Sequence, residues 1–123
     1  MGKSYIYIIG MAMLLLASCG QQHDAERIVK DFMEANMKDG SLVSSIDFDD
    51  MDSTKLITDS VITRIRATAK EAALYKSDIR YSEKNGGKKL YILRARYYVN
   101  KEEQCDTYYL DAGLTGVVAF KTN

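Results

Sequence analysis

The sequence predicts an α+β domain in which N-terminal helices pack on a C-terminal antiparallel β-meander. Two observations along the 123 residues predict this order. Apolar residues recur at helical spacing up to residue 74 and at every second position from residue 75 onward. Seven of the nine tyrosines lie between 75 and 109, and tyrosine is common in half-buried strands. This order is typical of helices packed on one face of a sheet.

A short apolar segment precedes the domain. Lys3 gives it a positive start, and the thirteen residues of the run Tyr5–Ala17 are apolar around Gly10. That run is shorter than the roughly 20 residues of a membrane-spanning helix. A charged start, an apolar run and then small residues are the order of a secretory signal. We therefore expect residues 1–18 to be a signal peptide.

The end of this segment, Leu16-Ala17-Ser18-Cys19, resembles the lipobox of bacterial lipoproteins at every position. The resemblance implies a diacylglyceryl group on the Cys19 sulfur, cleavage before Cys19, acylation of the new amine and a lipid anchor in the bilayer. Two or three acyl chains make that anchor durable, at about 0.8 kcal/mol per buried CH₂. Gly20 in place of Asp resembles lipoproteins of the outer membrane, in organisms that have one. A plain signal peptide or a single-pass anchor is the alternative, and residues 19–23 are interpreted as a lipidated tether.

Residues 24–123 are long enough for one small domain. Lys3 is the only charge in residues 1–18, so the rest of the chain carries 16 basic and 17 acidic residues. This balance gives no electrostatic case for nucleic acid as a partner. If Cys19 carries lipid, Cys105 has no partner in the chain. We interpret Cys105 as a strand residue acting as a small hydrophobe, with an intermolecular disulfide as the alternative.

Two helices are predicted. Asp24 is an N-cap residue, the apolar stripe that follows has helical spacing, and Gly40 is a natural C′ residue, which predicts a helix over 25–38. Asp52-Ser53-Thr54 is a second start signal, and it predicts a helix, or two short ones, over 54–74. Four threonines lower the helix propensity there, so a break near position 60 is the alternative.

An acidic run between the two predicted helices suggests a calcium site. It consists of Asp47, Asp49, Asp50 and Asp52. An EF-hand loop beginning at Asp47 would need Gly at position 52 and Glu at position 58, where the chain has Asp52 and Thr58. We interpret the run as a solvated loop that also caps the second helix. A loose surface cation site is the alternative.

Strands are predicted from Ile79 onward. Ile79 and Tyr81 begin one, and Asn85-Gly86-Gly87 has the composition of a hairpin turn. In the longest strand, one face is apolar throughout and should meet the helices, whereas the other carries arginines and should be wet. The longer predicted strands are Leu90–Val99, Gln104–Asp111 and Val117–Lys121.

The opening helix Ala25–Met33 with its Gly40 stop, and the closing pair Tyr108–Asp111 and Val117–Phe120, are similar to the cystatin-like and nuclear-transport-factor-like α+β rolls. Such families often have Trp in the closing strand, and here Phe120 would have to fill that space. The family contains dehydratases, isomerases and pure binding modules, so the resemblance implies a fold and no single function.

A noncatalytic binding or accessory domain at the cell envelope is the predicted function. Enzymes of the roll family need a proton-transfer group in the pocket between sheet and helix. The only histidine, His23, lies in the expected tether. Asp106 and Asp111 are interpreted as solvent-face residues or cross-strand partners. No catalytic residue, metal ligand or cofactor is therefore predicted.

The candidate ligand-binding residues are Tyr98, Arg94 and Arg96, which share the wet face of the longest predicted strand. They could hold a sugar, a peptide or an apolar ligand, although tyrosine is also an ordinary half-buried strand residue. The expected partners are the bilayer and either an envelope protein or a small ligand. The alternative function is a small-ligand-binding or weakly catalytic domain that uses the pocket between sheet and helix.

Overall fold

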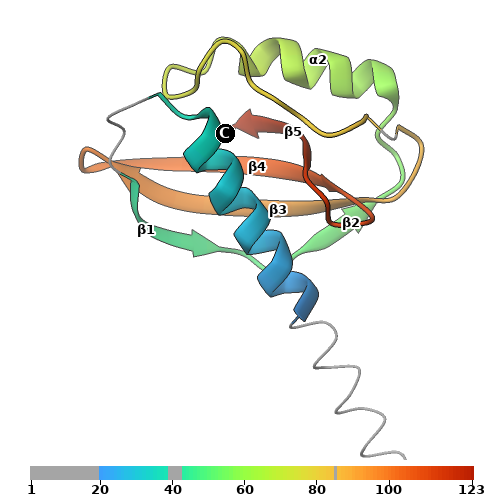
Figure 1. The fold of residues 1–123 in the computed structure, drawn as a ribbon, viewed down its shortest axis with the longest axis horizontal. Helices are drawn as coiled ribbons and strands as arrows, with labels where there is room; N and C mark the ends of the chain where they lie inside the picture. Colours follow the sequence, from blue (N-terminus) through green and yellow to red (C-terminus); the bar gives the residue numbers. More distant parts are fainter. Residues whose placement is uncertain (1–19, 39–42, 85) are drawn as a thin grey trace, which may run out of the picture.

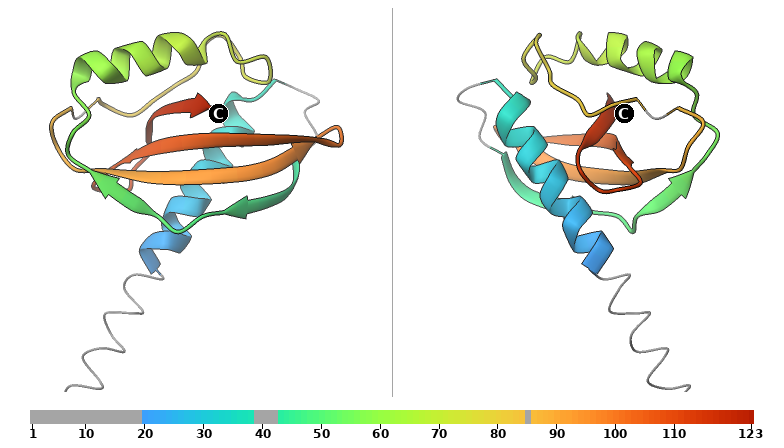
Figure 2. Two further views of the ribbon diagram at one scale, coloured as in Figure 1. Left: turned by 180° about the vertical axis from the view of Figure 1, so that it is seen from behind. Right: turned by 45° about the vertical axis from the view of Figure 1, so that its right-hand side comes forward.

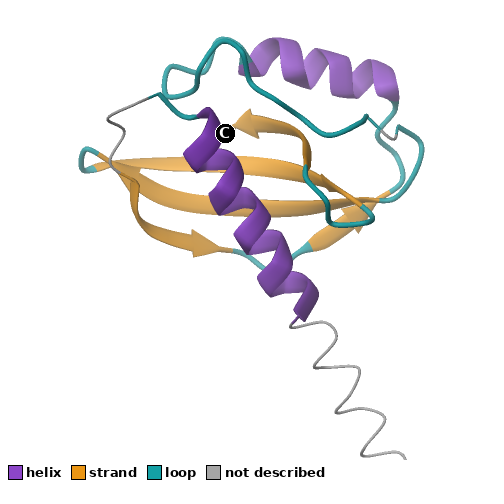
Figure 3. Ribbon diagram, in the orientation of Figure 1, coloured by secondary structure: helices purple, strands orange, loops and turns teal. Residues whose placement is uncertain are grey.

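A computed structural model describes residues 20–38, 43–84 and 86–123. It confirms the α+β class, because two helices pack on an antiparallel open sheet (Figure 1). The helix at 20–36 comes first, and Figure 3 shows how it crosses the sheet. The remaining elements are β1 (Val43–Phe48), β2 (Asp52–Thr54), α2 (Asp59–Ala69), β3 (Leu90–Val99), β4 (Glu102–Asp111) and β5 (Val117–Thr122).

The sheet has the order β1-β3-β4-β5, and β2 pairs with the other end of β3. Its centre is the long β3–β4 pair, whose register runs from Leu90 opposite Asp111 to Val99 opposite Glu102. The turn between these two strands uses Asn100 and Lys101, both with positive φ (51° and 72°). Positive φ at both central residues is the geometry of a type I′ hairpin turn, which matches the twist of paired strands.

The first helix packs one apolar side against the sheet. Its buried residues follow helical spacing, as the sequence predicts for 25–38. The helix already includes residues 20–23, which were expected to form a tether, and Gly40 lies outside the described residues. Gln22 anchors this end, because its side chain donates to the Asp49 carbonyl (3.1 Å) and accepts from the Met51 N–H (2.7 Å).

The second helix is shorter than predicted. α2 begins after Thr58, whose side-chain oxygen accepts a hydrogen bond from the Val61 N–H at 3.3 Å. Thr58 is therefore the N-cap. The expected start signal Asp52-Ser53-Thr54 instead forms β2, which pairs with the first residues of β3. The predicted helix over 54–74 is thus wrong at both ends, and the alternative of two short helices with a break near position 60 is wrong too, because residues 54–58 are not helical.

The two helices meet the sheet differently, because α2 reaches both of its sides: Ala69 joins the core of the first helix, whereas Ile62 does not. The first helix packs with Tyr91, Leu93 and other residues of the inner face of β3. Ile62 of α2 packs with Leu90 and Ile92, which alternate with those residues and point to the opposite side. Figure 2 shows α2 along the β5 edge, away from the first helix. The expectation that both helices cover one face therefore holds for the first helix and for Ala69 at the end of α2, and it is wrong for Ile62.

Aromatic rings fill the core between the first helix and the sheet. Phe120 is fully buried, and its ring centroid lies 4.3 Å from that of Tyr75 and 5.6 Å from that of Phe32. Tyr108 stacks on the same ring at 5.7 Å. Phe120 thus fills space at the centre of this core from the closing strand β5. Rings in such tilted and edge-on contacts add about 0.5–1.5 kcal/mol per pair beyond their burial.

The segment before β3 is a loop, and the strand predicted from Ile79 is wrong. Ser82 N–H reaches the Val117 carbonyl at 2.9 Å, and Arg80 N–H reaches the Asn36 side chain at 3.0 Å. These contacts fix the loop without forming a ladder. Gly86 N–H bonds to the Asp59 carboxylate at 2.8 Å, so the glycine pair meets the start of α2 and not a hairpin partner.

Candidate functional site

A buried carboxylate lies at the centre of the inner face of the sheet. Asp106 on β4 is 1% exposed, and its Oδ2 accepts hydrogen bonds from three tyrosine hydroxyls. The oxygen–oxygen distances are 3.1 Å to Tyr75, 2.5 Å to Tyr97 and 3.0 Å to Tyr108. The Tyr75 and Tyr108 hydroxyls also contact each other. We call these four residues the tyrosine–carboxylate cluster.

Strand alternation places three members of the cluster. Asp106 and Tyr108 are two residues apart on β4, so their side chains share a face. Ala95 lies opposite Asp106, which puts Tyr97 two positions along β3 on that same face. Both strands run through the core, so the four side chains of the cluster are buried next to apolar residues.

Tyr75 comes to the cluster from the segment after α2. That segment is tied to the end of the first helix, because Met37 and Tyr75 form an isolated antiparallel bridge. Lys38 N–H donates to the Leu74 carbonyl at 2.9 Å, and Lys76 N–H donates to the Asn36 carbonyl at 2.8 Å. These backbone bonds hold the Tyr75 ring above the sheet.

A cavity of about 450 Å³ adjoins the cluster, between the sheet and the end of α2. Asp106, Tyr75 and Tyr97 line it, together with Thr68, Ala69, residues 71–74 and the ends of β4 and β5. Its ionisable lining is mainly acidic, with Glu71 and Glu102 beside Asp106. We call it the Asp106 cavity. Oδ1 of Asp106 is buried and has no hydrogen-bond partner among the described residues.

The tyrosines of the cluster are held as neutral hydrogen-bond donors. Burial raises the pKa of Tyr75, Tyr97 and Tyr108 above the ordinary value of 10, and the Asp106 carboxylate raises each further. Their protons therefore stay in place at neutral pH and point toward acceptors. Since these donors serve Oδ2, Oδ1 is left to a different donor.

Asp106 and Asp111 were expected on a solvent face or in cross-strand pairs. The solvent face is wrong for both, whereas Asp106 does pair across strands, with Tyr97 on β3. Asp111 is 7% exposed and closes the β4–β5 turn, where its carboxylate accepts from Thr115 N–H at 2.7 Å and from Gly116 N–H at 3.4 Å. Asp106 faces the core. The signal that could have found it is its parity with Tyr108 and Leu110, the apolar positions of the same strand.

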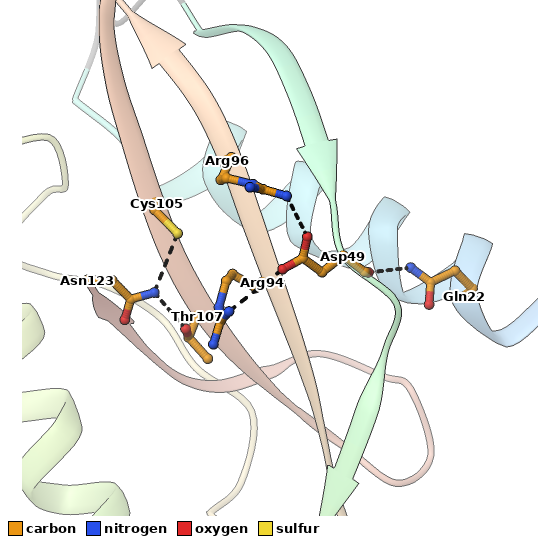
Figure 4. Close-up of polar contacts among 7 residues, drawn as sticks. All are labelled: Gln22, Asp49, Arg94, Arg96, Cys105, Thr107 and Asn123. Atoms are coloured by element: carbon orange, nitrogen blue, oxygen red, sulfur yellow. Dashed lines mark hydrogen bonds and ion pairs between the residues drawn. The ribbon is translucent and has the colours of Figure 1, made fainter.

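The residues predicted from the wet face lie on the opposite side of the sheet. Arg94, Arg96 and Tyr98 are all exposed, as expected, and we call this side the outer face. Figure 4 shows both arginines directed at one carboxylate. Arg96 Nη2 lies 2.8 Å and Arg94 Nη1 3.8 Å from the Asp49 oxygens. Tyr98 is 42% exposed. The structure thus brings the two arginines together around Asp49, on the face of the sheet opposite to the Asp106 cluster.

Cys105 lies on the same outer face, half-buried, with a free thiol. Asn123 reaches over it, because its side-chain amide lies 2.9 Å from the Thr107 hydroxyl and 3.5 Å from the Cys105 sulfur (Figure 4). The backbone N–H of Asn123 also donates to the Cys105 carbonyl at 2.8 Å. The chain end therefore extends the β4–β5 pairing past the thiol.

In the described part of the chain, neither a group of metal ligands nor a histidine adjoins the cluster. Within residues 20–38, 43–84 and 86–123, no group of three or more His, Cys, Asp or Glu side chains is placed to hold a metal ion. The acidic run is divided between β1, β2 and their link. His23 lies on the first helix and lines a different pocket, together with Asp50 and Tyr91.

Cys19 and the signal segment 1–18 lie outside the described residues. Among the described helices, none combines the length and the apolar character that a membrane crossing requires. Comparisons with protein families, with curated proteins and with solved structures find no match to this chain.

Proposed function

We propose that the chain is a lipid-anchored, noncatalytic binding domain of the cell envelope that binds a small ligand in the Asp106 cavity. The observation that carries the proposal is Oδ1 of Asp106, a buried carboxylate oxygen without a partner in a residue that lines this cavity. An ionised carboxylate only accepts hydrogen bonds, so a ligand with an N–H or O–H group complements it. Buried polar groups are normally paired, and an exception calls for an explanation.

The charge of the cavity favours a cationic donor. Glu71, Glu102 and Asp106 line it against Lys121, so the formal charge of the lining is negative. An ammonium group supplies donors and a positive charge together, and charge-assisted hydrogen bonds are about twice as strong as neutral ones. We therefore propose a small amine as the ligand class, with the resemblance to the roll families as support for a pocket between sheet and helix.

Binding is tested on the full chain in nonionic detergent by amide-detected NMR. Ethanolamine is the probe, and ethylene glycol is its neutral counterpart. We expect saturable shifts at Leu74 and Gln104 with ethanolamine, weakened by Glu71→Gln, an exposed lining position. Glu34→Gln, exposed on the first helix, is the matched control. Equal effects of the two substitutions, or no saturable shift, would overturn the proposal.

Anchoring is tested separately by cell fractionation. With lipid on Cys19, the parent chain should be found with membranes, and Cys19→Ala should leave the membrane fraction or remain unprocessed. Cys105→Ala is the control, because it removes the other cysteine of the chain and leaves the lipobox intact. Parent-like processing and location of Cys19→Ala would show that the lipobox is not used.

A second candidate function is an accessory contact with a larger envelope assembly. The observation that favours it is Tyr98, which is 42% exposed on the outer face beside Arg96 and Arg94. Exposed aromatic and arginine side chains are enriched in protein interfaces. Crosslinking in native membranes tests it, since Tyr98→Ala should remove a defined crosslinked species that Tyr91→Phe retains. Persistence of that species in Tyr98→Ala would exclude this face.

A further inference from the structure

A second pocket, of about 340 Å³, lies between α2 and the loop that leads to β3. Three cationic side chains line it: Arg66 and Lys70 at the end of α2, and Lys84 from the loop. Among the described residues, no Asp or Glu lines the pocket or forms an ion pair with these cations. We call it the basic pocket. Three positive charges in one concave site, on a domain with nearly balanced charge, need an explanation.

Arg66 is the fixed member of the basic pocket. Its Nε donates to the Val118 carbonyl at 2.8 Å, and its Nη2 donates to the Ser82 carbonyl at 2.7 Å. The guanidinium also stacks over the Tyr81 ring, 4.6 Å from the centroid. Burial lowers the pKa of Arg66, and the nearby Tyr81 and Asp59 offset this in part. The guanidinium is thus held in one orientation by neutral carbonyls, with N–H groups to spare.

The hydroxyls beside Arg66 are also unpaired. Tyr81 lines the basic pocket, and its hydroxyl is buried without a hydrogen-bond partner among the described residues. The hydroxyl of the next residue, Ser82, is buried and unpartnered too. Burial raises the pKa of Tyr81 to about 12, so this hydroxyl carries its proton at neutral pH. The Tyr81 hydroxyl is therefore a hydrogen-bond donor without an acceptor, and the Arg66 guanidinium lies over the ring that carries it.

We propose that the basic pocket binds a small soluble oxyanion, a carboxylate or a phosphate. Arg66 and the Tyr81 hydroxyl would bind its oxygens, and Lys70 would add charge at the rim. Lys84 is held in place by its bond to the Thr63 hydroxyl at 2.7 Å. Arg suits this role, since its planar fork matches the geometry of carboxylate and phosphate groups. The apolar part of the ligand would lie against Ile79, which also lines the pocket.

The position of the pocket favours a dissolved ligand over a lipid headgroup. In Figures 1 and 2, α2 lies at the opposite end of the molecule from residue 20, where the described part of the first helix begins. A bilayer that holds the chain at its N-terminal side would therefore be remote from the basic pocket. The same oxyanion chemistry in a lipid headgroup is an outcome that the test must separate.

The test uses inorganic phosphate and the full chain in nonionic detergent, at constant ionic strength, followed by ³¹P NMR. We expect saturable binding that Lys70→Gln weakens about tenfold, the effect of one lost charged hydrogen bond. Lys101→Gln is the matched control, because it makes the same charge change in the exposed β3–β4 turn. Tyr81→Phe should also weaken binding without lowering thermal stability, since it removes a hydroxyl that has no partner.

Three outcomes would overturn the proposal. The first is no saturable phosphate binding, and the second is an equal effect of Lys70→Gln and Lys101→Gln. The third comes from a parallel assay with phosphatidylglycerol vesicles. If the Cys19→Ala chain sediments with these vesicles in a Lys70-dependent manner and phosphate does not compete, the ligand is a lipid headgroup and not a dissolved anion.

Discussion

The Tyr75 hydroxyl donates to Asp106 Oδ2 across 31 residues of sequence, at a distance of 3.1 Å. This bond joins the segment after α2 to the middle of β4. Tyr75 is the only member of the tyrosine–carboxylate cluster that comes from outside the β3–β4 pair, since Asp106, Tyr97 and Tyr108 lie on those strands. The position of the whole segment over the Asp106 cavity therefore depends on this contact and on the backbone bonds that flank it.

Tyr75→Phe should lower the free energy of unfolding by about 2 kcal/mol, because it removes a buried hydrogen bond to a carboxylate and keeps the ring. Urea denaturation followed by circular dichroism measures this. Tyr98→Phe is the control, since its hydroxyl is on the exposed outer face and should change stability by less than about 0.5 kcal/mol. Similar losses in both variants would show that the cluster contributes little.

Alkaline pH should destabilise the fold through the same cluster. Burial raises the pKa of Tyr97 in the folded chain, whereas an unfolded tyrosine ionises near pH 10. Above pH 10 the unfolded chain therefore binds fewer protons than the folded chain, so stability falls as pH rises. Below pH 10 this contribution is fully present.

The slope should be about 1.4 kcal/mol per pH unit for each tyrosine that stays protonated when folded. Between about pH 10 and 11, Tyr97→Phe should therefore reduce the slope of the unfolding free energy against pH by the contribution of one tyrosine. Urea denaturation at a series of pH values measures it. A parent-like slope in Tyr97→Phe would contradict the assignment.

Gln22→Ala should detach one end of the first helix from the link between β1 and β2. Two hydrogen bonds are lost, to the Asp49 carbonyl and from the Met51 N–H, so we expect a loss of about 1–2 kcal/mol. Gln21→Ala provides the comparison, because Gln21 is exposed and helical at the adjacent position. Thermal unfolding of both variants checks this, and equal melting temperatures would refute it.

Arg66→Lys should cost about 1–2 kcal/mol, although it keeps the charge. The guanidinium bonds to the Val118 and Ser82 carbonyls at once, and a single ammonium group cannot reproduce that fork. Arg64→Lys, exposed two residues earlier on α2, should be nearly neutral. Hydrogen exchange of the Ser82 amide offers a local readout, since it should speed up in Arg66→Lys only.

Regular hydrophobic patterns made the long elements predictable. β3 was predicted at its observed bounds, because ten residues alternate without interruption. β1 was missed because its pairing with β3 shifts register between Ser44 and Asp47, and Ser45 has a φ of 54°. Such a bulge breaks the period of two. β2 is three polar residues long, so only its partner strand makes it a strand.

The candidate site was harder to predict than the fold. A single aspartate among polar residues suggests a solvent face, and the three hydroxyls that stabilise Asp106 are 2, 9 and 31 residues away. Only the tertiary fold brings Tyr75 to that carboxylate. The outer-face residues were found because exposure follows directly from strand alternation. Arg66 could not be singled out from the sequence, because an arginine in a helix usually faces water, whereas here its side chain bonds to two backbone carbonyls.

The pairing of Ala95 with Asp106 also disfavours other registers of β4 against β3 during folding. If β4 slipped by one residue against β3, its side chains would change faces, and Cys105 or Thr107 would replace Asp106 in the core. The carboxylate would then lie beside the exposed arginines, and the buried tyrosine hydroxyls would lose their acceptor. A sheet held only by apolar contacts tolerates such a slip more easily than one in which a buried carboxylate must meet three hydroxyl donors. The buried Asp106 thus favours a single register of β3 against β4.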